Sequence, residues 1–82
     1  MIDELVGELE ELGLKIESVD EIQRDTLIKT SDGVDIWIFP LGDGYETRLE
    51  FNDLVHFTDG GPDLAVSIVN AHEAIRLARV TS

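Results

Sequence analysis

The sequence predicts one α+β domain over residues 1–82, with an antiparallel meander of three to four strands between an N-terminal and a C-terminal helix. Residues 45–51 alternate between apolar or threonine side chains and charged ones, which is typical of a strand with one buried face. Glycine-containing turn signals precede this segment and the strand before it, and apolar residues near both ends of the chain recur at helical spacing. The predicted element order is therefore α-β-β-β-(β)-α, with the bracketed strand left open.

The N-terminal helix is expected over roughly residues 2–12. Asp3 and Glu4 lie in its first turn, where acids favour the positive end of the helix dipole. Gly13 follows the last apolar residue, as a C-cap glycine does. The apolar residues that define this helix are Ile2, Leu5, Val6, Leu9 and Leu12.

The first two strands are expected on either side of a polar loop. Residues 14–17 alternate and start the first strand, residues 26–30 are β-branched and form the second, and residues 20–25 make the loop. The dipeptide Asp32-Gly33 predicts a type I′ turn, which would pair the second strand antiparallel with the third.

The third and fourth strands, residues 34–39 and 45–51, form the hairpin around which the rest of the chain is arranged. Pro40 is expected to end the third strand, and residues 42–44 reverse the chain. Residues 54–57 either continue the fourth strand past a bulge or form a short fifth strand; the sequence leaves both open.

The C-terminal helix is expected over about residues 62–79, after a flexible turn at residues 58–63 with Pro62 at the first helical position. It is mostly apolar, so we expect it to pack deeply on the sheet. Its predicted apolar stripe consists of Leu64, Ile68, Ala71, Ile75 and Ala78, widened by Val66, Val69 and Leu77.

Charge is the outlying property of the composition. Eighteen Asp and Glu residues against six Lys and Arg give a formal net charge of -12, beyond the magnitude of about 2 to 8 that suits a small soluble domain. Such a field repels nucleic acid and anionic membranes, and it speeds encounter with basic surfaces. We therefore expect a basic protein surface as partner, and neither direct nucleic-acid binding nor membrane binding.

The N-terminal residues are acidic where a targeting peptide would be basic, and apolar runs are short, which predicts a cytoplasmic protein. The chain has no cysteine, which excludes disulfides and thiolate chemistry.

No segment carries a catalytic, cofactor or metal-binding motif, so we expect neither an enzyme nor a cofactor or metal site. The glycines at 42–44 and 60–61 are interpreted as turn residues, since Asp59 and Asp63 lie where a bound phosphate would be. The acids do not follow the calcium-loop pattern. His72 is interpreted as part of a polar helix surface.

Trp37 is the strongest candidate for a contact residue. If Val34, Ile36 and Ile38 face the helices, Trp37 points with Asp35 to the other side of the sheet, where tryptophan among charged residues is typical of a protein interface. Acids gather on that face and on the outside of the first helix. The candidate partner-binding residues are Glu4, Glu8, Glu10, Glu11, Asp35, Trp37, Glu46 and Glu50.

In its size, acidity, lack of catalytic motifs and helix, meander, helix order, the chain resembles the small acidic inhibitors that phages use against host defences, anti-CRISPR proteins among them. The resemblance implies a non-enzymatic inhibitor that acts in the host cytoplasm. It would occupy a basic nucleic-acid-binding channel through the acids of the first helix and the Trp37 face. Carboxylates spaced along a rigid scaffold can compete with phosphates for the Lys and Arg residues of such a channel.

Two other functions stay open. In a small cytoplasmic domain of a salt-loving organism, the acid-rich surface would serve solubility in concentrated salt and would say nothing about partners. In a homodimeric adaptor or regulatory subunit, the face of Trp37 and Phe39 would join two copies.

Overall fold

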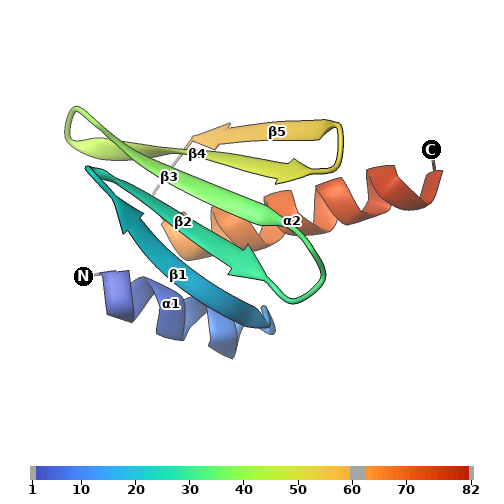
Figure 1. The fold of residues 1–82 in the computed structure, drawn as a ribbon, viewed down its shortest axis with the longest axis horizontal. Helices are drawn as coiled ribbons and strands as arrows, with labels where there is room; N and C mark the ends of the chain where they lie inside the picture. The colour runs from blue at the N-terminus through green and yellow to red at the C-terminus, as the bar shows by residue number, and fades with distance from the viewer. Residues whose placement is uncertain (1, 60–62, 82) are drawn as a thin grey trace.

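The computed structural model describes residues 2–59 and 63–81, in which two helices pack on one face of a five-stranded antiparallel sheet (Figure 1). The strands lie side by side in sequence order. This arrangement confirms the predicted α+β class and shows that the segment left open forms a separate fifth strand. The elements are α1 (Ile2–Glu11), β1 (Ile16–Ile22), β2 (Asp25–Thr30), β3 (Asp35–Leu41), β4 (Gly44–Phe51), β5 (Leu54–Asp59) and α2 (Leu64–Thr81).

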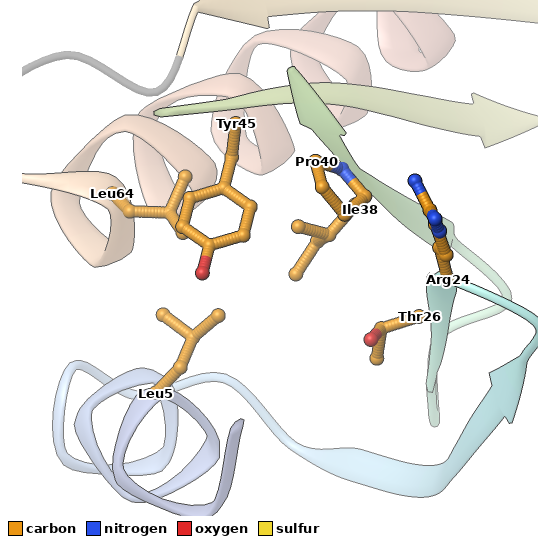
Figure 2. Close-up of a pocket in the computed structure, with 7 residues that line it drawn as sticks. All are labelled: Leu5, Arg24, Thr26, Ile38, Pro40, Tyr45 and Leu64. Carbon is orange, nitrogen blue, oxygen red and sulfur yellow. The ribbon is translucent and has the colours of Figure 1, made fainter. Parts of the chain in front are cut away.

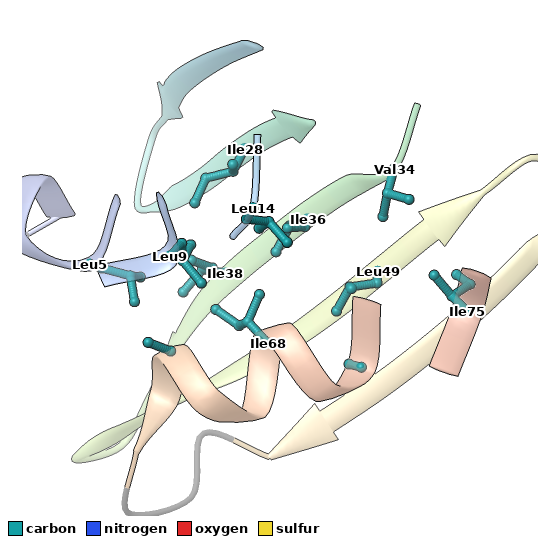
Figure 3. Packing of buried hydrophobic residues seen from close by; sticks show 12 residues of the cluster. Leu5, Leu9, Leu14, Ile28, Val34, Ile36, Ile38, Leu49, Ile68 and Ile75 are labelled. Atoms are coloured by element: carbon teal, nitrogen blue, oxygen red, sulfur yellow. The ribbon is translucent and has the colours of Figure 1, made fainter. Parts of the chain in front are cut away.

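The hydrophobic core lies between the two helices and the face of the sheet that they cover, which we call the inner face (Figure 3). Leu9 of α1 and Ile68 of α2 are fully buried and point toward the central strands. The alternation of β3 and β4 directs every second side chain into this layer. The core consists of Leu5, Leu9, Leu14, Ile28, Val34, Ile36, Ile38, Leu49, Ala65, Ile68, Ala71 and Ile75.

The C-terminus of α1 is capped by Gly13, as the sequence predicts. Gly13 has a φ of 101°, and its N–H donates to the carbonyl of Glu10 at 3.0 Å. The N–H of Leu14 donates to the carbonyl of Leu9, also at 3.0 Å, which completes a Schellman motif. Leu14 enters the core, so this cap also directs the chain from the helix toward β1.

The predicted polar loop at residues 20–25 is wrong. β1 starts at Ile16 rather than Leu14 and runs on to Ile22, so only Gln23 and Arg24 connect it to β2. Gln23 takes a positive φ of 59° to make this short turn. β1 is an edge strand, and its last four residues are exposed. A strand in this position needs no alternation of apolar and polar residues, so the sequence pattern does not reveal it.

The connection from β2 to β3 is a tight turn, but it is not of type I′. That type needs positive φ at both central residues, and of the predicted central pair, Asp32 and Gly33, only Gly33 has it, at 92°. The N–H of Gly33 donates to the carbonyl of Thr30 at 3.2 Å. From this turn the Asp32 carboxylate contacts the Thr30 hydroxyl and the His72 ring.

Pro40 does not end β3, which continues to Leu41. Pro40 pairs with Tyr45 of β4, while β2 pairs with β3 no further than Ile38. At Pro40, β3 therefore has a neighbouring strand on one side only, and a residue without an N–H is tolerated at such a position.

α2 begins at Leu64, and Asp63 is its N-cap: the Asp63 Oδ1 accepts the N–H of Val66 at 3.2 Å. The predicted helical position of Pro62 lies outside the described residues. The predicted buried stripe is confirmed at Ile68, Ala71 and Ile75, but Val66 and Leu77 are exposed and do not widen it. Ala78 is exposed as well, whereas Ala65, which the predicted stripe did not include, is buried.

Candidate functional site

The face of the sheet opposite the helices carries no other described element, and we call it the outer sheet face. Trp37 is paired in register with Leu27 on one side and with Arg48 on the other, and Arg48 is paired with Phe57. Directly paired residues point to the same side of a sheet, so these four side chains form a row across it. The outer sheet face includes Leu27, Lys29, Asp35, Trp37, Phe39, Glu46, Arg48, Glu50, Val55 and Phe57.

Arg48 lies against two aromatic rings at the centre of this face. Its guanidinium carbon is 5.9 Å from the centroid of the Trp37 ring and 5.2 Å from that of Phe39. The two rings are parallel, with an interplanar angle of 2° and centroids 6.1 Å apart. Attraction between the cation and the ring faces holds the side chain flat on the sheet. The result is a rigid platform of two aromatic rings and a guanidinium.

The Nε of Arg48 has a nearby negative charge but no hydrogen-bond acceptor among the described residues. Its Nε lies 3.8 Å from the Glu50 Oε2, too far for a hydrogen bond. The same Nε is buried and has no hydrogen-bond partner among the described residues. Glu50 therefore acts on Arg48 through charge rather than through a bond.

β5 adds exposed apolar surface beside the platform. Phe57, next to Arg48 in register, is 61% exposed, and Val55, next to Glu50, is 51% exposed. An exposed phenylalanine beside a half-buried tryptophan and an arginine is the composition typical of the central part of a protein interface.

Acidic side chains flank the aromatic row on this face. Asp35 lies directly opposite Glu50, and Glu46 lies directly opposite Phe39. Like charges placed opposite one another in a sheet are destabilising. Lys29, the neighbour of Asp35 on β2, offsets part of this repulsion. The carboxylates around the platform therefore repel one another, and this repulsion is only partly offset within the sheet.

The structure divides the predicted partner-binding residues between two surfaces. Asp35, Trp37, Glu46 and Glu50 come together on the outer sheet face, with Trp37 oriented as predicted. The acids of α1 are exposed, but α1 packs on the inner face, so the sheet separates them from the platform. The residues on the α1 surface are Glu4, Glu8, Glu10 and Glu11.

Sequence analysis misjudged His72, which is buried rather than part of a polar helix surface, with 7% of its area exposed. Its Nε2 lies 3.0 Å from the Asp32 Oδ2. The Thr30 hydroxyl donates to the Asp32 Oδ1, and the Arg76 Nε is 3.8 Å from the same carboxylate. This cluster connects α2 to the turn between β2 and β3. The spacing of four residues from Ile68, which places His72 beside the buried stripe, is the signal that could have revealed it.

Partial burial of Asp32 by itself would raise its pKa. The hydrogen bonds from Thr30 and His72, together with the charge of His72, outweigh that effect and hold the pKa of Asp32 below its ordinary value. The ionised carboxylate is therefore the form that the fold stabilises.

Comparison of the chain with protein-family models, with curated proteins and with solved structures finds no match. Across the described parts of the chain, no group of three or more His, Asp and Glu side chains is placed to hold a metal ion. Neither of the two described helices combines the length and apolarity needed to cross a membrane.

Proposed function

We propose that this chain is a non-enzymatic protein-binding module, which uses its outer sheet face to occupy a basic surface of a partner, in particular one that binds nucleic acid. The single observation that carries the proposal is the Arg48 platform: a guanidinium held on Trp37 and Phe39, beside an exposed Phe57, within a frame of carboxylates. The few residues that dominate the binding free energy of protein interfaces are enriched in tryptophan, tyrosine and arginine.

The carboxylates give this face its preference for a basic partner. Asp35, Glu46 and Glu50 are half-buried around the platform, where they can pair with Lys or Arg side chains of the partner at the rim of a desolvated centre. The net charge of -12 adds long-range attraction, which raises the rate of association.

In this proposal the acids of α1 contribute to that long-range field and not to the contact itself. A module of this kind would block nucleic-acid binding by its partner, as an anti-defence inhibitor does, and would act in the cytoplasm.

A homodimer joined through the same face is the second candidate, and the exposed Phe57 and Val55 favour it. Two copies placed face to face would bring Asp35, Glu46 and Glu50 of one against those of the other. Such a dimer would become stronger as salt screens the repulsion, whereas a complex with a basic partner would become weaker. Light scattering over a range of protein and salt concentrations separates the two.

The proposed function is tested with a fluorescent peptide that alternates arginine and leucine, and with a matched peptide in which serine replaces leucine. We expect binding of the leucine peptide that weakens with salt, and weaker binding of the serine peptide. Phe57→Ala should weaken binding about tenfold, the size of an interface hot spot. The double variant Glu46→Lys, Glu50→Lys should have a similar effect. Fluorescence anisotropy measures both.

The matched control is Glu8→Lys, Glu11→Lys, which changes the net charge by the same amount on α1. It should slow association but leave most of the affinity at about 0.15 M salt, where the Debye length is about 8 Å. Equal losses from the two double variants would show that only net charge matters, and would contradict the assignment of the contact to the outer sheet face.

A further inference from the structure

A pocket of about 230 Å³ opens at the end of the molecule where the first turns of both helices meet the sheet (Figure 2). Leu5 of α1 and Leu64 of α2 form one side of it, and Ile38 and Pro40 of β3 form its base. These side chains give the pocket apolar walls. It lies on the inner side of the sheet, away from the platform of Arg48, so it does not belong to the outer sheet face.

The charge of the pocket is opposite to that of the protein. Its one charged lining residue among the described residues is Arg24, although the chain carries three times as many acids as basic residues. Arg24 lies in the turn between β1 and β2, and it forms no ion pair with any described residue. A guanidinium without a carboxylate partner, beside an apolar pocket of a strongly acidic protein, provides local selectivity for an anion.

Two hydroxyl groups complete the polar part of the lining. Thr26 is almost fully buried, and the hydroxyl of Tyr45 points into the space above Leu5 (Figure 2). Neither hydroxyl has a hydrogen-bond partner among the described residues. An apolar pocket with a few convergent polar groups is the usual form of a small-molecule site.

The size and lining define the class of ligand. An apolar cavity of about 150 Å³ accommodates benzene, and pockets for drug-sized ligands begin at about 300 Å³. We propose that this pocket binds a small monocarboxylic acid with an unbranched or aromatic apolar body. Its carboxylate pairs with Arg24, and its apolar body lies between Leu5, Ile38 and Leu64. This site is independent of the proposed protein-binding function.

The probes are octanoate, octylammonium and octanol, which share one apolar chain and differ in the charge of the head group. Backbone amide shifts in NMR report binding to the full chain. We expect saturable shifts at the lining residues with octanoate, with a Kd near or below about 1 mM. Binding of octylammonium should be weaker even though the net charge of -12 attracts it. Octylammonium binding as well as octanoate, or the absence of saturable octanoate shifts, would overturn the proposal.

Arg24→Gln tests the charge, and because Arg24 is exposed in a turn the variant should fold normally. We expect it to weaken octanoate about tenfold while octanol is unaffected. Lys29→Gln is the control, since it removes the same charge from the exposed surface of β2. Equal losses of octanoate affinity in the two variants would show that the pocket has no specific anion site. Tyr45→Phe, which keeps the ring, measures the contribution of the hydroxyl separately.

Discussion

Asp32 is the residue that joins the two layers of the protein through polar contacts. It lies in the turn between β2 and β3, accepts a hydrogen bond from Thr30 beside it, and contacts His72 and Arg76 across the inner face. The Thr30 hydroxyl also accepts the N–H of Val34 at 3.0 Å, so the same threonine fixes the turn from within. One turn is thereby fastened to the C-terminal helix.

Asp32→Asn should destabilise the protein at neutral pH by about 1 kcal/mol. This is less than the roughly 1.5 to 3 kcal/mol typical of hydrogen bonds to charged groups, because the carboxylate is partly exposed. Asp43→Asn removes the same charge from the exposed turn between β3 and β4, and it should have almost no effect. Chemical denaturation followed by circular dichroism measures both. A loss in Asp43→Asn as large as that in Asp32→Asn would contradict a specific role for the cluster.

We expect the effect of Asp32→Asn on the free energy of unfolding to depend on pH. The folded state lowers the pKa of Asp32, so its stabilising contribution is complete above the ordinary aspartate pKa of about 3.9 and is lost as the pH falls through the lowered value. The difference in free energy of unfolding between wild type and Asp32→Asn should therefore be constant from neutral pH to about pH 5 and disappear in stronger acid. A difference that grows on acidification would show that the sign is wrong.

At the scale of single elements, two glycines act on α1 in opposite ways, one inside the helix and one in the cap that follows it. Gly7 lies inside the helix, with open space where a Cβ would be. Gly13 has a φ of 101°, which residues other than glycine rarely adopt. Gly7→Ala should stabilise the protein by about 0.5 to 1 kcal/mol. Gly13→Ala should destabilise it by about 1 to 2 kcal/mol. Thermal melts that shift in the same direction for both would contradict the Schellman cap.

The elements that could be predicted from the sequence are those whose burial imposes a period. β3 and β4 alternate because the helices cover only one face of them, and α1 shows its stripe for the same reason. The bounds of β1 could not be predicted. This exposed edge strand is held by backbone pairing, and its polar side chains show no periodic pattern. Pro40 was misjudged because its tolerance depends on where β2 stops, which is a property of the sheet and not of the local sequence.

The candidate site was predictable in part. The alternation of β3 placed Trp37 and Asp35 on the outer face correctly. The contribution of Phe57 depends on the register between β4 and β5, which no local signal gives. The pocket beside Arg24 is formed by three strands and two helices, β2, β3, β4, α1 and α2, which come together only in the folded chain. Separation of the α1 acids from the sheet acids likewise becomes visible only when the layers are assembled.

At the scale of the whole molecule, a net charge of -12 makes the protein repel itself, and salt screens that repulsion. Twelve of the described residues form a buried core between the helices and the sheet, and we expect this core to hold the protein folded in dilute buffer. A thermal melt at low ionic strength should show cooperative unfolding, and about 2 M salt should raise its midpoint by screening self-repulsion. A chain that is unfolded in dilute buffer and folds only in salt would favour the alternative of a domain from a salt-loving organism.

The two edges of the sheet differ in how they would meet another unpaired strand. β1 carries Glu17, Asp20 and Glu21 along its exposed edge, so a second copy brought alongside it would align carboxylate with carboxylate. Residues 54–58, most of β5 at the other edge, contain no carboxylate. Growth of the sheet from molecule to molecule is therefore blocked at one end by charge, and a fibre, if this protein formed one, would have to begin at β5.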